Sequence, residues 1–498
     1  MLCKVGGFID NHEGRKFAII MEFRNKVEKM SKGTRYEHVE ITDFAAEGKC
    51  IFKSEDGVIF IEGDVAPGDI VDLEVVRTKK KLKEAIVTKV HSFSSLRTQP
   101  YCQHFGVCGG CKWQHIGYEH QLRFKRQQVV DHFQRIGKIK DVEINPILAG
   151  PETTYYRNKL EFTFSNYRWV TKEQLDSGEI FSKNALGFHV PKRFDKIFTV
   201  QKCHLQPDPS NAIRNSLHAF GEGQGIPYYD VKYNVGTLRN LVVRTANTGD
   251  IMVIVQFGEK NDEAIDSVMN YMKDMHPEIT SLNYIVNLKG NDSYQDQEVI
   301  HFAGETTIRE TMEDLTFLVG PKSFYQTNSD QAYNLFKVTR EYAGLTGNES
   351  VYDLYTGTGT IANFVARQAK KVVGVEYVEA AVKDARINSA INGITNTEFF
   401  AGDMRWIMNE AFLAKHGRPD VIITDPPRAG MDVPVIETML KAAPDKIVYV
   451  SCNTATQARD LALMSEDYEV TKVQPVDMFP NTHHVENVAL LVRKDRSF

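Results

Sequence analysis

The residues best suited to chemistry lie at the ends of apolar segments in the last third of the chain. Cys452 ends IVYVSCN, Asp425 opens DPPRAG after an apolar segment, and Glu486 begins the apolar run ENVALL just after His483 and His484. A thiolate can add to an electrophilic carbon and later leave, while a carboxylate can take up a proton. A cysteine considered alone is more often a buried structural residue, so its neighbours must decide its role.

Methylation of a uracil ring at C5 needs this combination. C5 is a weak nucleophile until a thiolate adds at C6, and the C5 proton must be removed before the thiol departs. We therefore predict Cys452 as nucleophile and Glu486 as base, with His483 and His484 as rival bases. Asp425 is expected beside the methyl donor and the substrate base. Amino-group methylation is an alternative, although Arg428 stands where a stacking aromatic would follow Asp-Pro-Pro.

A glycine-rich turn predicts the donor site. DLYTGTGT, residues 353–360, follows an apolar segment, and Gly357 and Gly359 permit close approach of the backbone to a ligand. Glu376 ends the next apolar segment and can accept hydrogen bonds from ribose hydroxyls, while Asp403 ends the third and faces the adenine side. The third glycine of the dinucleotide pattern is absent, so S-adenosylmethionine is favoured over NAD.

A second set of thiols lies far from these residues. Cys102, Cys108 and Cys111 follow a Cys-x5-Cys-x2-Cys spacing in a glycine-rich loop, and Cys203 is the best fourth ligand because Cys50 falls in an expected strand. Four thiolates suit a [4Fe–4S] cluster or a tetrahedral zinc ion. Three bunched cysteines and one remote cysteine favour iron–sulfur, with zinc and unligated thiols as alternatives.

The elements that must position the catalytic and donor residues alternate between strand and helix patterns from residue 321 to 498. This alternation predicts a doubly wound, mostly parallel Rossmann-like sheet, whose strands present their carboxyl ends at one edge. Residues 404–417 are expected to form one helix of this layer.

Two other regions precede this domain. Residues 35–97 read as four or five short strands of a small barrel of the oligonucleotide-binding kind. Its last hairpin carries a basic group that is either a solvated loop or a grip on phosphates: Arg77, Lys79, Lys80, Lys81 and Lys83. Residues 1–34 are expected to be a poorly ordered or untranslated extension.

Residues 98–320 are expected to form a central α+β domain around the cysteine cluster. An amphipathic helix is predicted near residues 120–140, followed by a β-rich stretch. The helix is expected to carry Arg123, Lys125, Arg126 and Arg135 on its polar positions. The strands carry Arg157, Lys159, Arg239 and Arg244, read either as a solvated sheet edge or as an RNA-facing wall.

Composition limits the classes of protein. The chain has 498 residues, a net charge of −5 and 42% hydrophobic residues, which describe a multidomain globular protein. If the protein binds nucleic acid, its basic surface must be local. Seven cysteines argue against a disulfide framework. We expect a cytoplasmic protein, because no apolar window approaches the length of a membrane span and the N-terminus lacks a signal-peptide layout.

The motifs DLYTGTGT, DPPRAG, SCN and HHVEN, in this order, resemble the uracil-5-methyltransferases of the RumA and TrmA group over about residues 35–498. The resemblance implies Cys452 as nucleophile, Glu486 as base, and a set of donor-site residues: Gln326, Tyr355, Glu376 and Asp425. Gln326 comes from SFYQTN. The chain departs from the RumA type at Thr356 and Thr360, which puts in doubt a side-chain contact to the donor at residue 360.

The cysteine spacing is similar to that of the RumA (RlmD) type acting on 23S ribosomal RNA, and the barrel resembles a TRAM domain. We therefore predict S-adenosylmethionine-dependent C5-methylation of a uridine in RNA, with 23S ribosomal RNA as the expected substrate. Methylation of transfer RNA and a catalytically inactive RNA-binding assembly factor are alternatives. No obligate protein partner is implied, and the cluster is expected to have a structural or RNA-positioning role.

Overall fold

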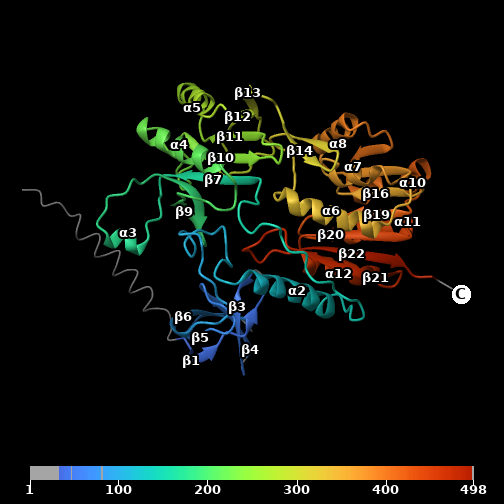
Figure 1. Cartoon of the computed structure of the whole chain (residues 1–498), viewed down its shortest axis with the longest axis horizontal. Helices are drawn as coiled ribbons and strands as arrows, with labels where there is room; N and C mark the ends of the chain where they lie inside the picture. The colour runs from blue at the N-terminus through green and yellow to red at the C-terminus, as the bar shows by residue number, and fades with distance from the viewer. Residues whose placement is uncertain (1–32, 46–47, 56, 80–81, 496–498) are drawn as a thin grey trace, which may run out of the picture. The chain divides into compact units, whose positions relative to one another are not determined.

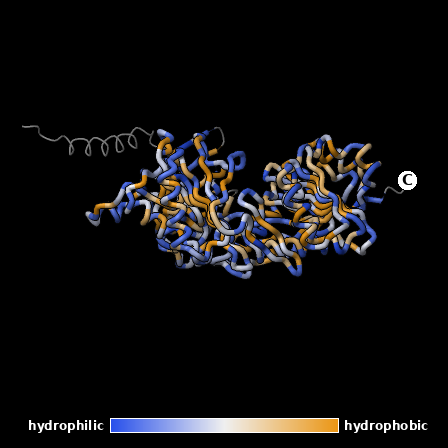
Figure 2. The backbone as a smooth tube through the Cα atoms, turned by 90° about the horizontal axis from the view of Figure 1, so that it is seen from above, coloured by the Kyte–Doolittle hydropathy of each residue, from blue (hydrophilic) through white to orange (hydrophobic). Residues whose placement is uncertain are grey.

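The computed structural model describes residues 33–45, 48–55, 57–79 and 82–495, so the expectation for the first 34 residues falls almost wholly outside it, as do Lys80 and Lys81. The chain divides into two compact units, residues 1–97 and 98–498. Figure 2 shows hydrophobic segments concentrated inside the folded parts and hydrophilic segments on the outer loops. Among the described residues no helix is long and apolar enough to cross a membrane.

The first unit is a small barrel. Its strands are β1 (Arg35–Glu40), β2 (Asp43–Phe44), β3 (Cys50–Ser54), β4 (Gly57–Glu62), β5 (Ile70–Lys79) and β6 (Leu82–Ser92), in the order β1-β5-β6-β4-β3-β2. Because two residues separate the outermost strands β1 and β2, the sheet must curl until its ends meet. The structure has six strands rather than four or five, since the first is interrupted after Glu40. Ile41, Ile59 and Leu73 lie in its core.

The second unit begins with a seven-stranded sheet. It contains β7 (Lys159–Ser165), β8 (Ala185–Val190), β9 (Arg193–Thr199), β10 (Leu238–Thr245), β11 (Ile251–Phe257), β12 (Ser281–Val286) and β13 (Ile300–Gly304), in the order β13-β12-β11-β10-β7-β8-β9. Helices α4 (Ser210–Gly223) and α5 (Asp262–Met275) lie along the sheet in Figure 1 and bury its apolar side chains on one face. A short helix, α3 (Lys172–Asp176), lies in the connection from β7 to β8.

A second seven-stranded sheet carries the predicted catalytic residues. It contains β16 (Ser350–Leu354), β17 (Lys371–Glu376), β18 (Thr397–Ala401), β19 (Val421–Thr424), β20 (Lys446–Ser451), β21 (Tyr468–Val476) and β22 (Glu486–Arg493), in the order β18-β17-β16-β19-β20-β22-β21. The strands run parallel except β22, which is antiparallel to both β20 and β21. The expected doubly wound, mostly parallel sheet is present.

Helices cover both faces of this sheet. On one face lie α6 (Ser329–Ala343), α7 (Thr360–Ala366) and α8 (Glu379–Ile391); on the other lie α9 (Met404–Ile407), α10 (Glu410–His416), α11 (Val433–Ala442), α12 (Thr454–Met464) and α2 (Tyr118–Arg135). The single helix expected over residues 404–417 is wrong. Asn409 leaves the helical conformation and caps α10, where its side chain accepts a hydrogen bond from the Phe412 N–H.

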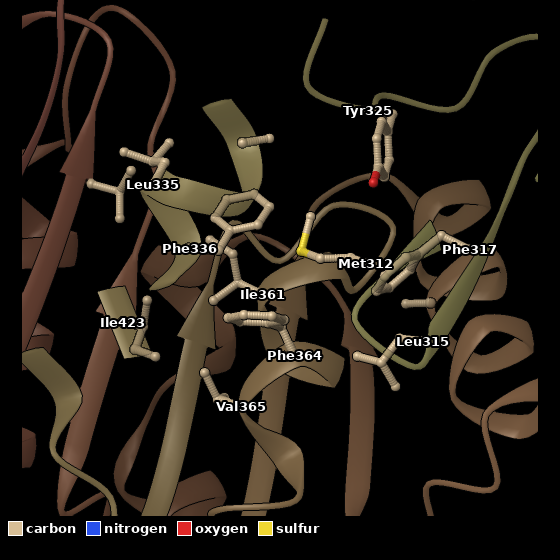
Figure 3. Packing of buried hydrophobic residues seen from close by; sticks show 14 of the residues in the cluster. Met312, Leu315, Phe317, Tyr325, Leu335, Phe336, Ile361, Phe364, Val365 and Ile423 are labelled. Atoms are coloured by element: carbon tan, nitrogen blue, oxygen red, sulfur yellow. The ribbon is translucent and has the colours of Figure 1, made fainter. Parts of the chain in front are cut away.

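The hairpin of β14 (Ile308–Met312) and β15 (Leu315–Val319) belongs to the core of the second sheet. Met312 and Phe317 gather with Ile361 and Phe364 of α7 in Figure 3. The expected boundary at residue 320 therefore falls inside one compact unit, because residues on both sides of it share a core.

Three basic side chains expected at the surface are buried, and those expectations are wrong. Lys125 lies in the buried stripe of α2, where its Nζ donates to Asp477 Oδ1 at 2.5 Å and to the Phe479 carbonyl at 3.0 Å. Arg239 donates to the carbonyls of residues 287, 289 and 291, and Arg244 donates to the Ser323 carbonyl. These cations hold loops together and do not form an RNA-facing wall.

Candidate active site

Cys452 and Glu486 meet at the carboxyl edge of the second sheet. β20 and β22 pair antiparallel, and their register ends with Ser451 opposite Asn487. One further step along each strand brings Cys452 opposite Glu486, and directly opposed residues project from the same face of a sheet. Asp425 follows β19, the neighbour of β20, and its backbone N–H donates to the Leu354 carbonyl at 3.3 Å. The three predicted catalytic side chains thus come from three adjacent strands.

The pKa values of these three groups reflect first their burial and then the charges close to them. Burial raises the pKa of Glu486 to about 8, aided by the charge of Asp425 and opposed by Arg428. Burial and then Asp353 raise the pKa of Asp425 to about 7. Burial raises the pKa of Cys452 to about 11, with Glu486 and Asp425 adding to the rise and Arg428 opposing it. A thiol, a base and a neighbouring acid therefore share one poorly hydrated site.

The same loop holds the rival bases His483 and His484, whose rings lie 4.1 Å apart. Burial, together with nearby cationic groups, lowers the pKa of His483 to about 3 and that of His484 to about 4. Groups of such low pKa are poor proton acceptors at neutral pH, whereas Glu486 is matched to that range. The site favours Glu486 as the base.

Side chains that the sequence did not single out hold this edge in shape. Asn453 Nδ2 donates to the Arg428 carbonyl at 2.9 Å, and Thr456 Oγ1 donates to the same carbonyl at 3.2 Å, which ties DPPRAG to the residues after Cys452. The buried carboxylate of Asp460 accepts hydrogen bonds from the Met431 N–H and the Tyr449 hydroxyl. Helix-capping rules could have identified Asn453, but Asp460 lies within a helix and gives no such signal.

The glycine turn adopts the conformation expected of a donor site. Tyr355, Gly357 and Gly359 have φ values of 63°, 54° and 75°, in the left-handed region. The Gly357 N–H donates to Glu376 Oε2 at 3.1 Å, and the Val378 N–H donates to Glu376 Oε1 at 2.9 Å. These bonds hold the carboxylate at the turn and leave further lone pairs for the hydroxyls of a ribose.

The two other predicted donor-site residues lie at the same edge. The carbonyl of Phe324 accepts a hydrogen bond from Thr358 Oγ1 at 3.3 Å, which brings Gln326, two residues later, beside the glycine turn. Asp403 follows β18 as expected, but its carboxylate binds the guanidinium of Arg405, with Oδ1 and Oδ2 each 3.0 Å from Nε.

The four predicted ligand cysteines line one cavity: Cys102, Cys108, Cys111 and Cys203. Within the described part of the chain, no three of their sulfurs lie within 4.8 Å of one another. Four thiolates on one zinc ion, with bonds of about 2.3 Å, would stand about 3.8 Å apart. A [4Fe–4S] cluster binds each thiolate through a different iron, so it does not need the four sulfurs to be this close together.

Asn481 joins the cysteine loop to the loop that carries Glu486. Its carbonyl accepts hydrogen bonds from the N–H groups of Lys112 and Trp113, both at 3.0 Å, directly after Cys111. Its Nδ2 donates at 3.0 Å to the hydroxyl of Tyr101, directly before Cys102. The thiol cavity and the catalytic edge are therefore mechanically connected.

Residues 242–494 match the protein family described as tRNA (Uracil-5-)-methyltransferase. A relative from Bacteroides thetaiotaomicron, named an uncharacterized RNA methyltransferase, is 54% identical over 451 residues, covering 90% of this chain and 99% of its own. A relative of the same name from Porphyromonas gingivalis is 51% identical over 465 residues, covering 91% and 99%.

A solved structure also matches nearly the whole chain. It is the Pyrococcus abyssi tRNA (uracil-54, C5)-methyltransferase in complex with S-adenosyl-L-homocysteine. The TM-score is 0.71 at 29% identity, and the match covers 92% of this chain and all of the other.

Proposed function

The chain belongs to the tRNA (uracil-5-)-methyltransferase family and is an S-adenosylmethionine-dependent RNA methyltransferase; from this premise we propose that it methylates C5 of a uridine in ribosomal RNA through a covalent intermediate on Cys452. The observation that carries the mechanism is the meeting of Cys452, Glu486 and Asp425 at one sheet edge.

The reaction begins when the Cys452 thiolate adds to C6 of a uracil that has left its stack. The addition pushes an electron pair toward C5, which then attacks the methyl group of the sulfonium and releases S-adenosyl-homocysteine. Glu486 takes the C5 proton, the C5–C6 double bond re-forms, and the Cys452 thiolate leaves. The net products are 5-methyluridine, S-adenosyl-homocysteine and one proton.

The donor occupies the glycine turn in this proposal. Glu376 accepts hydrogen bonds from its ribose hydroxyls, and Gln326 and Tyr355 contact it from the sides of the turn. Asp425 lies between the donor and the base, where its raised pKa lets it hold a proton and donate to a carbonyl of the uracil. Asp403 reaches the adenine only if it shares its ion pair with Arg405.

We assign a [4Fe–4S] cluster to Cys102, Cys108, Cys111 and Cys203, which would hold its four irons. When bound, such a cluster supplies four strong iron–thiolate bonds that close the loop between residues 102 and 203. Through Asn481, the residues flanking Cys102 and Cys111 then keep the Glu486 loop in place. This gives the cluster a structural role.

The choice of ribosomal RNA rests on two resemblances, the cysteine spacing of the RumA type and the TRAM-like barrel, whose exposed Arg77 and Lys79 are suited to a phosphate backbone. Transfer RNA is the second candidate, favoured by the full-length likeness to the Pyrococcus abyssi enzyme. Sequencing of 5-methyluridine positions in both RNAs from a strain lacking this protein separates the two. Loss of a transfer RNA position alone would overturn the ribosomal assignment.

A covalent adduct tests the mechanism. RNA containing 5-fluorouridine has no C5 proton to lose, so with donor present it should trap the enzyme in a band that survives denaturing electrophoresis. Cys452→Ala should give no such band, and Cys50→Ala, which alters the barrel core, should still give it. Failure of the unaltered protein to form an adduct on an RNA that it methylates would refute the covalent route.

A further inference from the structure

A polar pocket separate from the active site lies on the seven-stranded sheet of β7 to β13, on the face that α4 and α5 do not cover. Strand register places Thr163 of β7, Asn240 of β10 and Gln256 of β11 side by side. Directly opposed residues share a face, so their side chains form one row. Further along the same face, Val242 and Ile254 pack into the core of the second sheet. This face of the sheet is therefore apolar where it packs into the core of the second sheet and polar at Thr163, Asn240 and Gln256.

Among the residues that the structure describes, three buried amide atoms in this row have no hydrogen-bond partner. Asn240 is 1% exposed, and its Nδ2 donates to Thr163 Oγ1 at 3.3 Å. Its Oδ1, and both amide atoms of the fully buried Gln256, have no hydrogen-bond partner within the described part of the chain. Buried polar atoms are almost always paired. Asn240 lines the pocket, so its unpaired Oδ1 points to a ligand bound there, whereas Gln256 lies behind it on the next strand.

Aromatic side chains wall the space above Asn240, which has a volume of about 190 Å³. Tyr229 is buried, with the guanidinium of Arg239 stacked 4.4 Å from its ring centre, whereas Phe194 is 69% exposed at the mouth. A large exposed aromatic beside a polar pocket offers a face on which a planar ring can stack.

The charges around this space do not favour an anion. Among the lining residues only Arg239 is permanently cationic, and its nitrogens already donate to the carbonyls of Asn287, Lys289 and Asn291. Asp292 adds a negative charge at the rim. A phosphate would find Arg239 already engaged and Asp292 at the rim, while a neutral planar ring with donors and acceptors on its edge fits the site.

We propose that this pocket binds an unpaired nucleobase of the substrate RNA, separate from the uridine that is methylated. Carboxamides pair with the edges of bases, and aromatic side chains stack on their faces. Asn240 reads the edge of the base, and Phe194 with Tyr229 encloses the ring. The inference rests on RNA being the substrate, but not on which RNA or which atom receives the methyl group.

Photocrosslinking of the full chain tests the pocket directly. A single-stranded RNA of random sequence carrying 4-thiouridine should crosslink to peptides containing Phe194 or Tyr229. Phe194→Ala and Asn240→Leu should each lose that crosslink and weaken binding of the RNA by about tenfold. Tyr233→Ala, an exposed aromatic that does not line the pocket, should change neither.

The outcomes separate this inference from the proposed reaction. Cys452→Ala should keep the pocket crosslink while losing methyl transfer, and Phe194→Ala should still bind S-adenosylmethionine in calorimetry. Phe194 is exposed, so its removal decides the matter even if Asn240→Leu fails to fold. Unchanged RNA binding by Phe194→Ala, or crosslinks confined to other peptides, would overturn the proposal.

Discussion

The molecule uses thiols in two regions whose surroundings differ. Burial raises the pKa of Cys108 and Cys111 to about 12, and it raises that of Cys452 to about 11. In the cysteine loop the neighbours are other thiols around one cavity. At the sheet edge the neighbours are Glu486, Asp425 and Arg428.

This difference shows that burial alone does not determine the chemical role of a thiol. Several thiols around one space can share a metal cluster, because each binds its own iron. A single thiol with a proton acceptor opposite it can form and break one bond to carbon. The two regions should therefore respond in opposite ways to loss of a sulfur, and the following changes are ordered from the largest expected effect to the smallest.

Cys452→Ala should lower methyl transfer by at least about 10⁴-fold, because no other group at the edge can add to C6. Its iron content and melting temperature should match those of the unaltered protein. Single-turnover assays with a radioactive methyl group measure the first effect, and iron analysis with calorimetry measures the others. Methyl transfer by Cys452→Ala within about tenfold of normal would mean that Cys452 is not the nucleophile and that the two groups of thiols do not differ in this way.

Glu486→Gln should slow turnover by about 10³-fold, since it removes the proton acceptor but leaves the nucleophile. The methylated RNA should then accumulate as a covalent adduct on Cys452, even with ordinary uridine. Gel electrophoresis under denaturing conditions detects it. Glu469→Gln, an exposed residue of β21, is the matched control. Normal turnover in Glu486→Gln would return the role of base to His483 or His484.

Cys203→Ser should remove bound iron and lower the free energy of unfolding by about 4 kcal/mol, as expected for loss of a metal site. Activity should fall because the Glu486 loop loses its support through Asn481. Iron analysis and chemical denaturation measure the change, with Cys50→Ser as the comparison. Zinc in place of iron in the unaltered protein would keep these ligands but change the metal.

The smallest effect concerns pH. Below the pKa of Glu486, about 8, its ionised fraction falls by about tenfold per pH unit, so turnover should rise with pH. Above this value the rise should become less steep but continue, because the thiolate fraction of Cys452, with a pKa of about 11, still increases. Arg428 lowers the pKa of Glu486, so Arg428→Gln should move the rise to higher pH. Initial rates across the neutral range measure the shift. A pH profile that does not move would mean that Arg428 does not act on the base.

The sequence predicts the second sheet well because its strands and helices alternate with short connections. The positions of Cys452, Glu376 and Asp425 follow from strand ends alone. Lys125 could not be placed in this way, since its partner Asp477 lies 352 residues further on and a lysine in a helix normally reads as polar. The burial of Arg239 could not be predicted for the same reason, because its carbonyl partners lie on a loop about 50 residues further along the chain. Helices α4 and α5 were not predicted from the sequence, because the strand pattern of the segments around them is stronger.

The position of β22 has a consequence for the order of synthesis. This strand is the last of the sheet to be made, yet it lies between β20 and β21 and brings in Glu486. Domains fold as units while the chain emerges from the ribosome, N-terminal parts first. The cysteine loop and the active edge belong to one compact unit, so neither can be complete before β22 has emerged. A nascent chain should be unable to modify RNA until Glu486–Arg493 have left the ribosome.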